Sequence, residues 1–213
     1  MNTFERLWRT AGIQFVGLTI LAYIIYGALP GVGAPADAVV SFYHGDRMRV
    51  LVASVFAGLA VLNLMWFAAA LRTTLADAGY DGWGAAATAS SAAVGVLAFV
   101  LIAIAATLAS SNAAGLNDFA WTCGVVSSFP RAMLIMSSAF GLWRAKLISN
   151  TLFTAGVSVV ILGVLGGTTW APNGFWAPDG AYSRFILPVI SLVWVLVVSR
   201  VLLTRAPATR AGW

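Results

Sequence analysis

An arginine and a proline stand side by side inside a long apolar run of the chain. The run reads "FAWTCGVVSSFPRAMLIMSSAFGLW", with Pro130 and Arg131 near its middle. A charged side chain at the centre of a membrane costs ~2.5–3.5 kcal/mol on insertion scales and ~10–17 kcal/mol in simulations, so it faces the protein interior and takes a partner. Arg131 is therefore expected to be either a structural tie or a basic site for an anionic ligand.

The residues around Arg131 indicate which face of its helix points inward. Pro130 cannot donate to the carbonyl of Val126, which frees an acceptor and kinks the helix. Side chains at spacings of four and seven form a modestly polar stripe along one face. The stripe consists of Cys123, Ser127, Arg131 and Ser138.

Partners for this guanidinium are few in the sequence. No Asp or Glu lies inside an expected membrane span, and the nearest acidic residues, Asp46 and Asp118, are expected near the membrane surface. Arg131, Ser127 and Asn63 are the predicted ligand-binding residues, for a carboxylate or an anionic headgroup. In the alternative, Arg131 ties its kinked helix to neighbouring helices through carbonyls and hydroxyls.

A second polar cluster, "FYHGDRMR", occupies residues 42–49. His44 and Asp46 are the candidate catalytic residues, because together they could supply a general acid and a general base. In the alternative, Asp46 caps the start of a helix and the neighbouring arginines contact lipid phosphates.

The inventory of reactive side chains narrows the chemistry. The chain has one cysteine and one histidine, too few for an internal disulfide, a bis-histidine haem, or a zinc or copper site. No GxSxG, HExxH, P-loop or dinucleotide-binding pattern occurs. We therefore expect no metal and no cofactor.

The elements that position these residues are membrane spans. Of the 213 residues, 61% are hydrophobic and 9% are charged, against ~45–50% and ~25% in soluble domains. Six stretches approach the length that crosses ~30 Å of hydrocarbon. The prediction is an all-α integral membrane six-helix bundle, a single transmembrane domain over residues 1–213. The expected helices cover about 12–29, 50–71, 84–109, 119–143, 151–167 and 184–203.

The basic residues predict an orientation. A net charge of +5 could suggest nucleic acid, but the arginines are scattered singly between apolar runs, so no nucleic-acid partner is expected. Short cytoplasmic loops retain Lys and Arg. One set of segments holds eight basic residues: Arg6, Arg9, Arg72, Arg144, Lys146, Arg200, Arg205 and Arg210. The other set holds three: Arg47, Arg49 and Arg184. Both termini are therefore predicted to be cytoplasmic.

Small residues mark where helices should approach closely. The segment "GAAATASSAAVG" starts at Gly84, and Gly163 and Gly167 form a GxxxG pair. Such faces allow backbones to pack together in membranes, so both are expected to face protein.

The stretch "SFYHGDRMRVLVASVFAGLAVLNLMWFAAALRTTLADAG", residues 41–79, carries a resemblance. Its "GDRMR" element and the "AALR" element at 69–72, with the closing "LVWVLVVSRVLL", are similar to a group of uncharacterised six-helix membrane proteins from actinobacteria and related bacteria. The resemblance implies a multi-pass protein of a bacterial plasma membrane, and it implies no particular activity.

Three functions follow as expectations. The first is a non-enzymatic membrane protein that binds membrane lipids or a small amphiphilic or anionic ligand, or that serves as a subunit for a membrane-protein partner or a homo-oligomer. The second is a small transporter with its site near Arg131. The third is a membrane-embedded enzyme at the outer interface that uses His44 and Asp46. A cavity that reaches Arg131 would favour binding or transport, and an open pocket with His44 would favour the enzyme.

Overall fold

The computed structural model describes residues 10–204, and these residues form helices without any strand. In chain order the elements are α2 (Ala11–Tyr26), α3 (Ala36–Gly45), α4 (Arg47–Asp77), α5 (Asp81–Leu108), α6 (Leu116–Val126), α7 (Ser128–Arg144), α8 (Asn150–Gly166), the π-helical turn η1 (Tyr182–Ile186) and α9 (Leu187–Thr204).

Four helical stretches are long and apolar enough to cross a membrane: α4, α5, the continuous α6–α7 pair, and η1 with α9. The two other apolar helices, α2 and α8, are shorter, at 16 and 17 residues. The prediction of an all-α membrane protein is thus confirmed at the level of helix type, length and composition.

Two proline residues explain where the observed helices differ from the expected ones. The span expected at 119–143 is divided at Ser127, and Pro130 then falls in the first turn of α7, where a missing N–H has no acceptor to lose. The last span starts as a π-helical turn that ends two residues before Pro188. The short helix α3 was not expected. It buries only Val39 and Tyr43, one turn apart, against the ends of α4 and α5.

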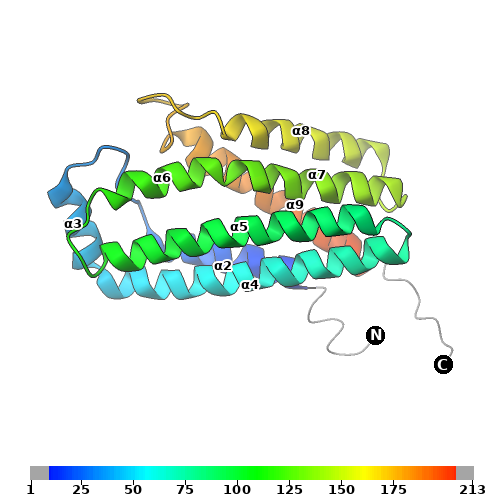
Figure 1. The fold of residues 1–213 in the computed structure, drawn as a ribbon, viewed down its shortest axis with the longest axis horizontal. Helices are drawn as coiled ribbons and strands as arrows, with labels where there is room; N and C mark the ends of the chain where they lie inside the picture. The colour runs from blue at the N-terminus through cyan, green and yellow to red at the C-terminus, as the bar shows by residue number, and fades with distance from the viewer. Residues whose placement is uncertain (1–9, 205–213) are drawn as a thin grey trace.

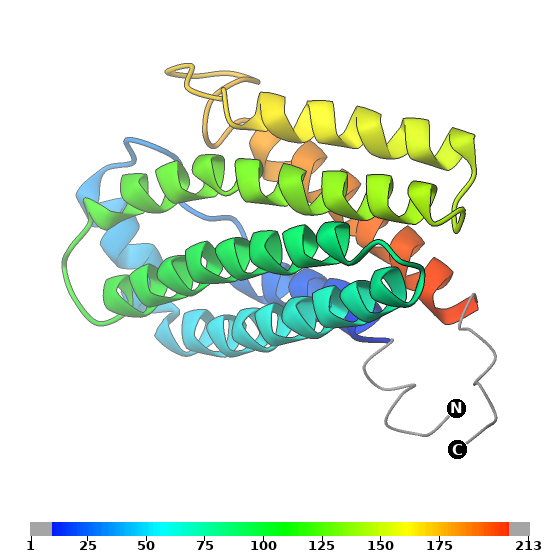
Figure 2. The same ribbon diagram turned by 45° about the vertical axis from the view of Figure 1, so that its right-hand side comes forward.

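The long elements surround a common interior (Figures 1 and 2). Around it, α2 contacts α4, α4 contacts α5, α5 contacts α6 and α7, α7 contacts α8, and α9 lies between α8 and α2. Helix α9 runs diagonally behind α6–α7, from beside α8 toward α4 (Figure 1). One end of the molecule carries α3, and we refer to it as the α3 end. The α4–α5 and α7–α8 turns lie at the opposite end (Figure 2).

This diagonal path divides the interior into two packed cores. At the opposite end, the second half of α9 fills the interior with Trp194, Val198 and Leu202, which pack on α4 and α7. At the α3 end, a smaller core joins α3 to the ends of α4 and α5, around Tyr43 and Leu108. Because α9 leans outward toward the α3 end, its first turns do not fill the interior between these cores.

The expected small-residue faces do pack against protein. A Cβ added at Gly163 would meet the Cβ of Ala132 at 3.0 Å, and one added at Gly167 would overlap the ring of Phe129. On α5, Ser91 Oγ donates to the carbonyl of Leu64 at 3.3 Å. Helices α4 and α5, and likewise α7 and α8, are therefore held together by backbone approach as well as by side chains.

Candidate functional site

A cavity of about 410 Å³ occupies the interior between the two cores. Its walls come from α2, α4, α5, α6, Arg131 of α7 and the start of the last span, with Tyr43 of α3 at one end. Most of the lining is aliphatic or aromatic, including Phe15, Leu64 and Leu101. Both the volume, within the ~300–1,000 Å³ of small-molecule sites, and the apolar lining with a few polar groups are typical of a binding pocket.

Arg131 lines this cavity and is half-buried. Its Nε donates to the carbonyl of Ser127 at 3.1 Å, and its Nη2 donates to the carbonyl of Gly124 at 3.0 Å and to Ser127 Oγ at 2.7 Å. All three acceptors belong to its own α6–α7 segment, and the carbonyl of Val126 is not among them. Within residues 10–204, Arg131 therefore makes no hydrogen bond to a helix outside its own α6–α7 segment, which corrects that form of the structural alternative.

The depth of the charge follows from the direction of the side chain. At about 1.5 Å per residue, the Arg131 Cα lies ~22 Å along the helix from the start of α6, but Gly124 lies only ~12 Å along it. A helical side chain leans toward the N-terminus of its helix, and Arg131 does so here. The guanidinium thus lies closer to the α3 end than its backbone position indicates.

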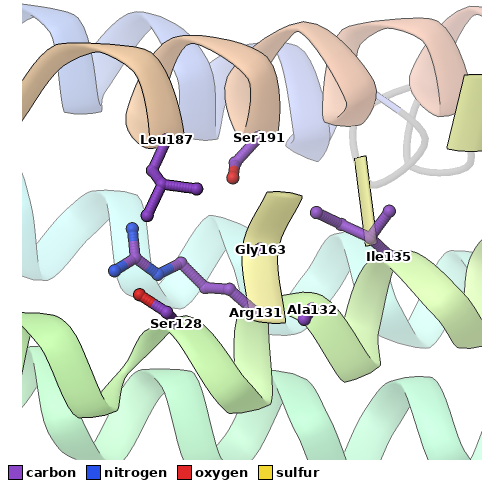
Figure 3. A pocket seen from close by; sticks show the side chains of 7 residues that line it. All are labelled: Ser128, Arg131, Ala132, Ile135, Gly163, Leu187 and Ser191. Carbon is purple, nitrogen blue, oxygen red and sulfur yellow. The ribbon is translucent and has the colours of Figure 1, made fainter. Parts of the chain in front are cut away.

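A narrow crevice lies on the side of Arg131 that faces α8 and α9 (Figure 3). The Arg131 side chain extends along α7 past Ser128 and ends beside Leu187 of α9 (Figure 3). The Ser128 hydroxyl is buried there and makes no hydrogen bond to any residue between 10 and 204. The crevice is too narrow to hold a water molecule, so the larger cavity is the candidate site.

A second arginine, Arg184 of η1, lines the same cavity. Pro188 has no N–H to offer the carbonyl of Arg184, and that carbonyl accepts instead from the hydroxyl of Tyr23 on α2, at 3.0 Å. The guanidinium donates to the carbonyl of Leu29 through Nη2 at 3.4 Å and lies 6.0 Å from the ring centroid of Trp121. The proline at the start of the last span thus positions a second cation on the cavity wall.

The cavity lining contains no carboxylate to balance these two charges. Tyr43 also lines the cavity, at the α3 end, but burial raises the pKa of its phenol above the ordinary value, with a smaller contribution from Tyr26. The phenol therefore stays neutral. Within residues 10–204, neither Arg131 nor Arg184 forms an ion pair.

The segment 27–35 is held at the α3 end by side chains from across the molecule. Asn117 Nδ2 donates to the carbonyl of Gly31 and Trp121 Nε1 to that of Pro30, both at 2.9 Å. Asp118 accepts from the backbone N–H of residue 33 at 2.9 Å, and Asp179 accepts from that of residue 32 at 3.1 Å. Asp118, expected near the surface as a possible partner of Arg131, is thus used here instead.

The remaining predicted site residues lie outside the cavity lining. Asn63 Nδ2 donates to the carbonyl of Leu59 in its own helix, at 2.9 Å. His44 Nε2 lies 3.1 Å from the carbonyl oxygen of Ser111 in an exposed contact. Asp46 stands at the N-cap position of α4 without a capping hydrogen bond from its side chain and pairs with Arg49 at 2.9 Å.

Of the predicted ligand-binding residues, the structure brings Arg131 and Ser127 together at the cavity and leaves Asn63 on another face. Arg184 was missed because, from sequence, it counted only as a loop charge. The signal that could have found it is Pro188, four residues later, which marks a free carbonyl and an irregular turn. In the described part of the chain, no three His, Cys, Asp or Glu side chains gather as a metal site would require. Comparisons with protein-family models, with curated proteins and with solved structures found no match for this chain.

Proposed function

We propose that this chain is a multi-pass protein of a bacterial plasma membrane that binds a lipid or small amphiphile in the cavity between its two cores. The proposal includes six spans. In its support, α2 and α8 are apolar and run alongside the four longer stretches (Figure 1). The bacterial location rests on the resemblance carried by residues 41–79.

The proposed orientation places the α3 end outside the cytoplasm. Four aspartates belong to segments at that end: Asp37, Asp46, Asp118 and Asp179. Toward the opposite end, the described residues include Arg72, Arg144, Lys146 and Arg200, the basic side chains expected on the cytoplasmic side. Four other residues of the basic count, Arg6, Arg9, Arg205 and Arg210, lie outside the described residues.

The single observation that carries the proposal is the cavity of about 410 Å³. An apolar wall suits a hydrocarbon chain, and a cation on that wall suits a polar headgroup. The packed core around Trp194 and Leu71 ends the cavity toward the opposite end, which favours binding over passage across the membrane. His44 and Asp46 lie away from the cavity, so it lends no support to the proposed enzyme.

Filling the cavity should prevent binding. Ala98 lines the cavity, and Ala98→Trp adds an indole to that space, so binding of a fluorescent single-chain amphiphile should fall by about tenfold or more. The measurement is a titration of the protein in phosphatidylcholine nanodiscs, corrected for partition into empty nanodiscs. Ala93→Trp is the matched control, because Ala93 lies on the same helix with its side chain exposed. Equal binding by the wild type and both variants would contradict the proposed function.

A further inference from the structure

Two guanidinium groups lie on one wall of the cavity, on successive turns of α6. Arg131 is bonded to the carbonyl of Gly124, and Arg184 lies over the ring of Trp121. Trp121 and Gly124 are three residues apart, which corresponds to about 4.5 Å along a helix. The two arginines therefore contact the same helix at points about one turn apart.

Both groups keep donors that the protein does not use. A guanidinium has five N–H donors. Arg131 uses Nε and Nη2, and its Nη1 makes no hydrogen bond within the described chain. Within the described chain, the Arg184 guanidinium makes one hydrogen bond, through Nη2 to the carbonyl of Leu29, at the long distance of 3.4 Å. Both arginines line the cavity, and guanidinium N–H donors are the groups with which arginine binds carboxylate or phosphate.

The charge balance points to the headgroup. The cavity lining supplies two cations and no carboxylate, so an occupant with two negative charges would balance it. A phosphate monoester carries about −1.5 to −2 charges at neutral pH and has three strong acceptor oxygens, whereas a carboxylate carries one charge. Resting on the proposed function, we propose that the cavity binds a single-chain amphiphile with a phosphate monoester headgroup, held by Arg131 and Arg184 together.

The rest of the cavity limits the tail. Away from the two arginines, the cavity is lined by aliphatic and aromatic side chains, including Phe15, Leu64 and Val94. Its volume, at the lower end of the ~300–1,000 Å³ range of small-molecule sites, suits one chain better than two. In the proposed complex, the hydrocarbon tail of the amphiphile lies toward the core around Trp194, and its phosphate lies toward the α3 end.

The first test compares headgroups on one chain length, with wild-type protein in phosphatidylcholine nanodiscs at pH 8. The probes are dodecyl phosphate, dodecanoate, dodecanol and inorganic phosphate, each corrected for partition into empty nanodiscs. Dodecyl phosphate should bind at least ~30-fold more tightly than dodecanol, with dodecanoate between them, because charge-assisted hydrogen bonds are the strong ones. If inorganic phosphate binds as tightly as dodecyl phosphate, the hydrocarbon chain contributes nothing, and the assignment of an amphiphile is overturned.

The second test removes one cation. Arg184→Gln should weaken dodecyl phosphate binding by about 10- to 100-fold and change dodecanol binding by less than about threefold. Arg184 has few bonds to lose, so this variant should fold normally. Arg72→Gln is the matched control: Arg72 pairs with Asp81 in an exposed contact at the opposite end, and binding should not change.

Failure of this inference differs from failure of the proposed function. Suppose that dodecanol and dodecyl phosphate bind equally well, that Arg184→Gln changes the binding of neither, and that Ala98→Trp abolishes the binding of both. The phosphate assignment is then overturned, and the cavity remains a binding site. If no amphiphile binds to the wild type above the level of empty nanodiscs, both proposals are overturned.

Discussion

Replacing Arg131 by leucine is expected to abolish the binding of anionic amphiphiles, with a loss of at least ~100-fold for dodecyl phosphate. Arg131→Leu removes a cation on the cavity wall together with the unused Nη1 donors, and each charged hydrogen bond contributes ~1.5–3 kcal/mol. Leucine fills part of the same space with apolar atoms, so dodecanol should still bind. The measurement is the nanodisc titration with both probes.

The same variant separates the two roles that the sequence leaves open for Arg131. Its hydrogen bonds go to Gly124 and Ser127 in its own α6–α7 segment, so within residues 10–204 no hydrogen bond from that segment to another helix depends on the guanidinium. Removing a charge from a membrane interior also removes the free-energy cost of burying that charge in hydrocarbon. The unfolding temperature in detergent should therefore stay within a few degrees of the wild type. A large fall in that temperature, with dodecyl phosphate binding unchanged, would instead assign Arg131 a structural role alone.

Replacing Gly156 by leucine is expected to lower the free energy of unfolding by about 2–4 kcal/mol. A Cβ at this position would lie 2.5 Å from the Trp194 ring and 2.9 Å from the Cβ of Ala139. Trp194 cannot turn aside freely, because its Nε1 donates to the buried Ser138 Oγ at 2.9 Å. Overpacking costs ~1–3 kcal/mol and a lost hydrogen bond about 1 kcal/mol more.

The check is the free energy of unfolding of Gly156→Leu in one detergent, with Gly17→Leu as the matched control. Gly17 is an exposed glycine of α2, and a Cβ there would meet no atom within 4 Å. The control should be as stable as the wild type, since leucine favours helix more than glycine does. Equal stability of the two variants would show that α8, α7 and α9 do not pack as described.

Much of the fold could be predicted from residue type alone. In hydrocarbon the backbone must satisfy its own hydrogen bonds, so a long apolar run has few choices other than a helix. Each of the six expected stretches accordingly overlaps helical residues of the structure, although the fourth is divided into α6 and α7 and the last starts as a π-helical turn. The short helix α3 could not be predicted in this way, because ten residues after "PGVGAP" carry a weak signal. Its two buried residues, Val39 and Tyr43, are buried by packing on the ends of α4 and α5, which the local sequence pattern does not show.

The site was predictable in part, for a related reason. A charge in an apolar run is visible in the sequence, and so is a polar residue one turn away, which identified Arg131 and Ser127. The cavity was not visible, because it results from the diagonal path of α9 between two cores. Arg184 faces the same cavity only because of this path, whereas Asn63 faces another side of α4. Helix rotation and tilt depend on packing between helices, and local sequence does not determine them.

Native mass spectrometry of the protein with dodecyl phosphate tests the central claim most directly, since it counts bound molecules. The wild type should carry one copy that survives gentle activation, and Ala98→Trp should carry none under the same conditions. Ala93→Trp should match the wild type. An equal number of copies on the wild type and Ala98→Trp, or no retained copy on either, would contradict a binding site in this cavity.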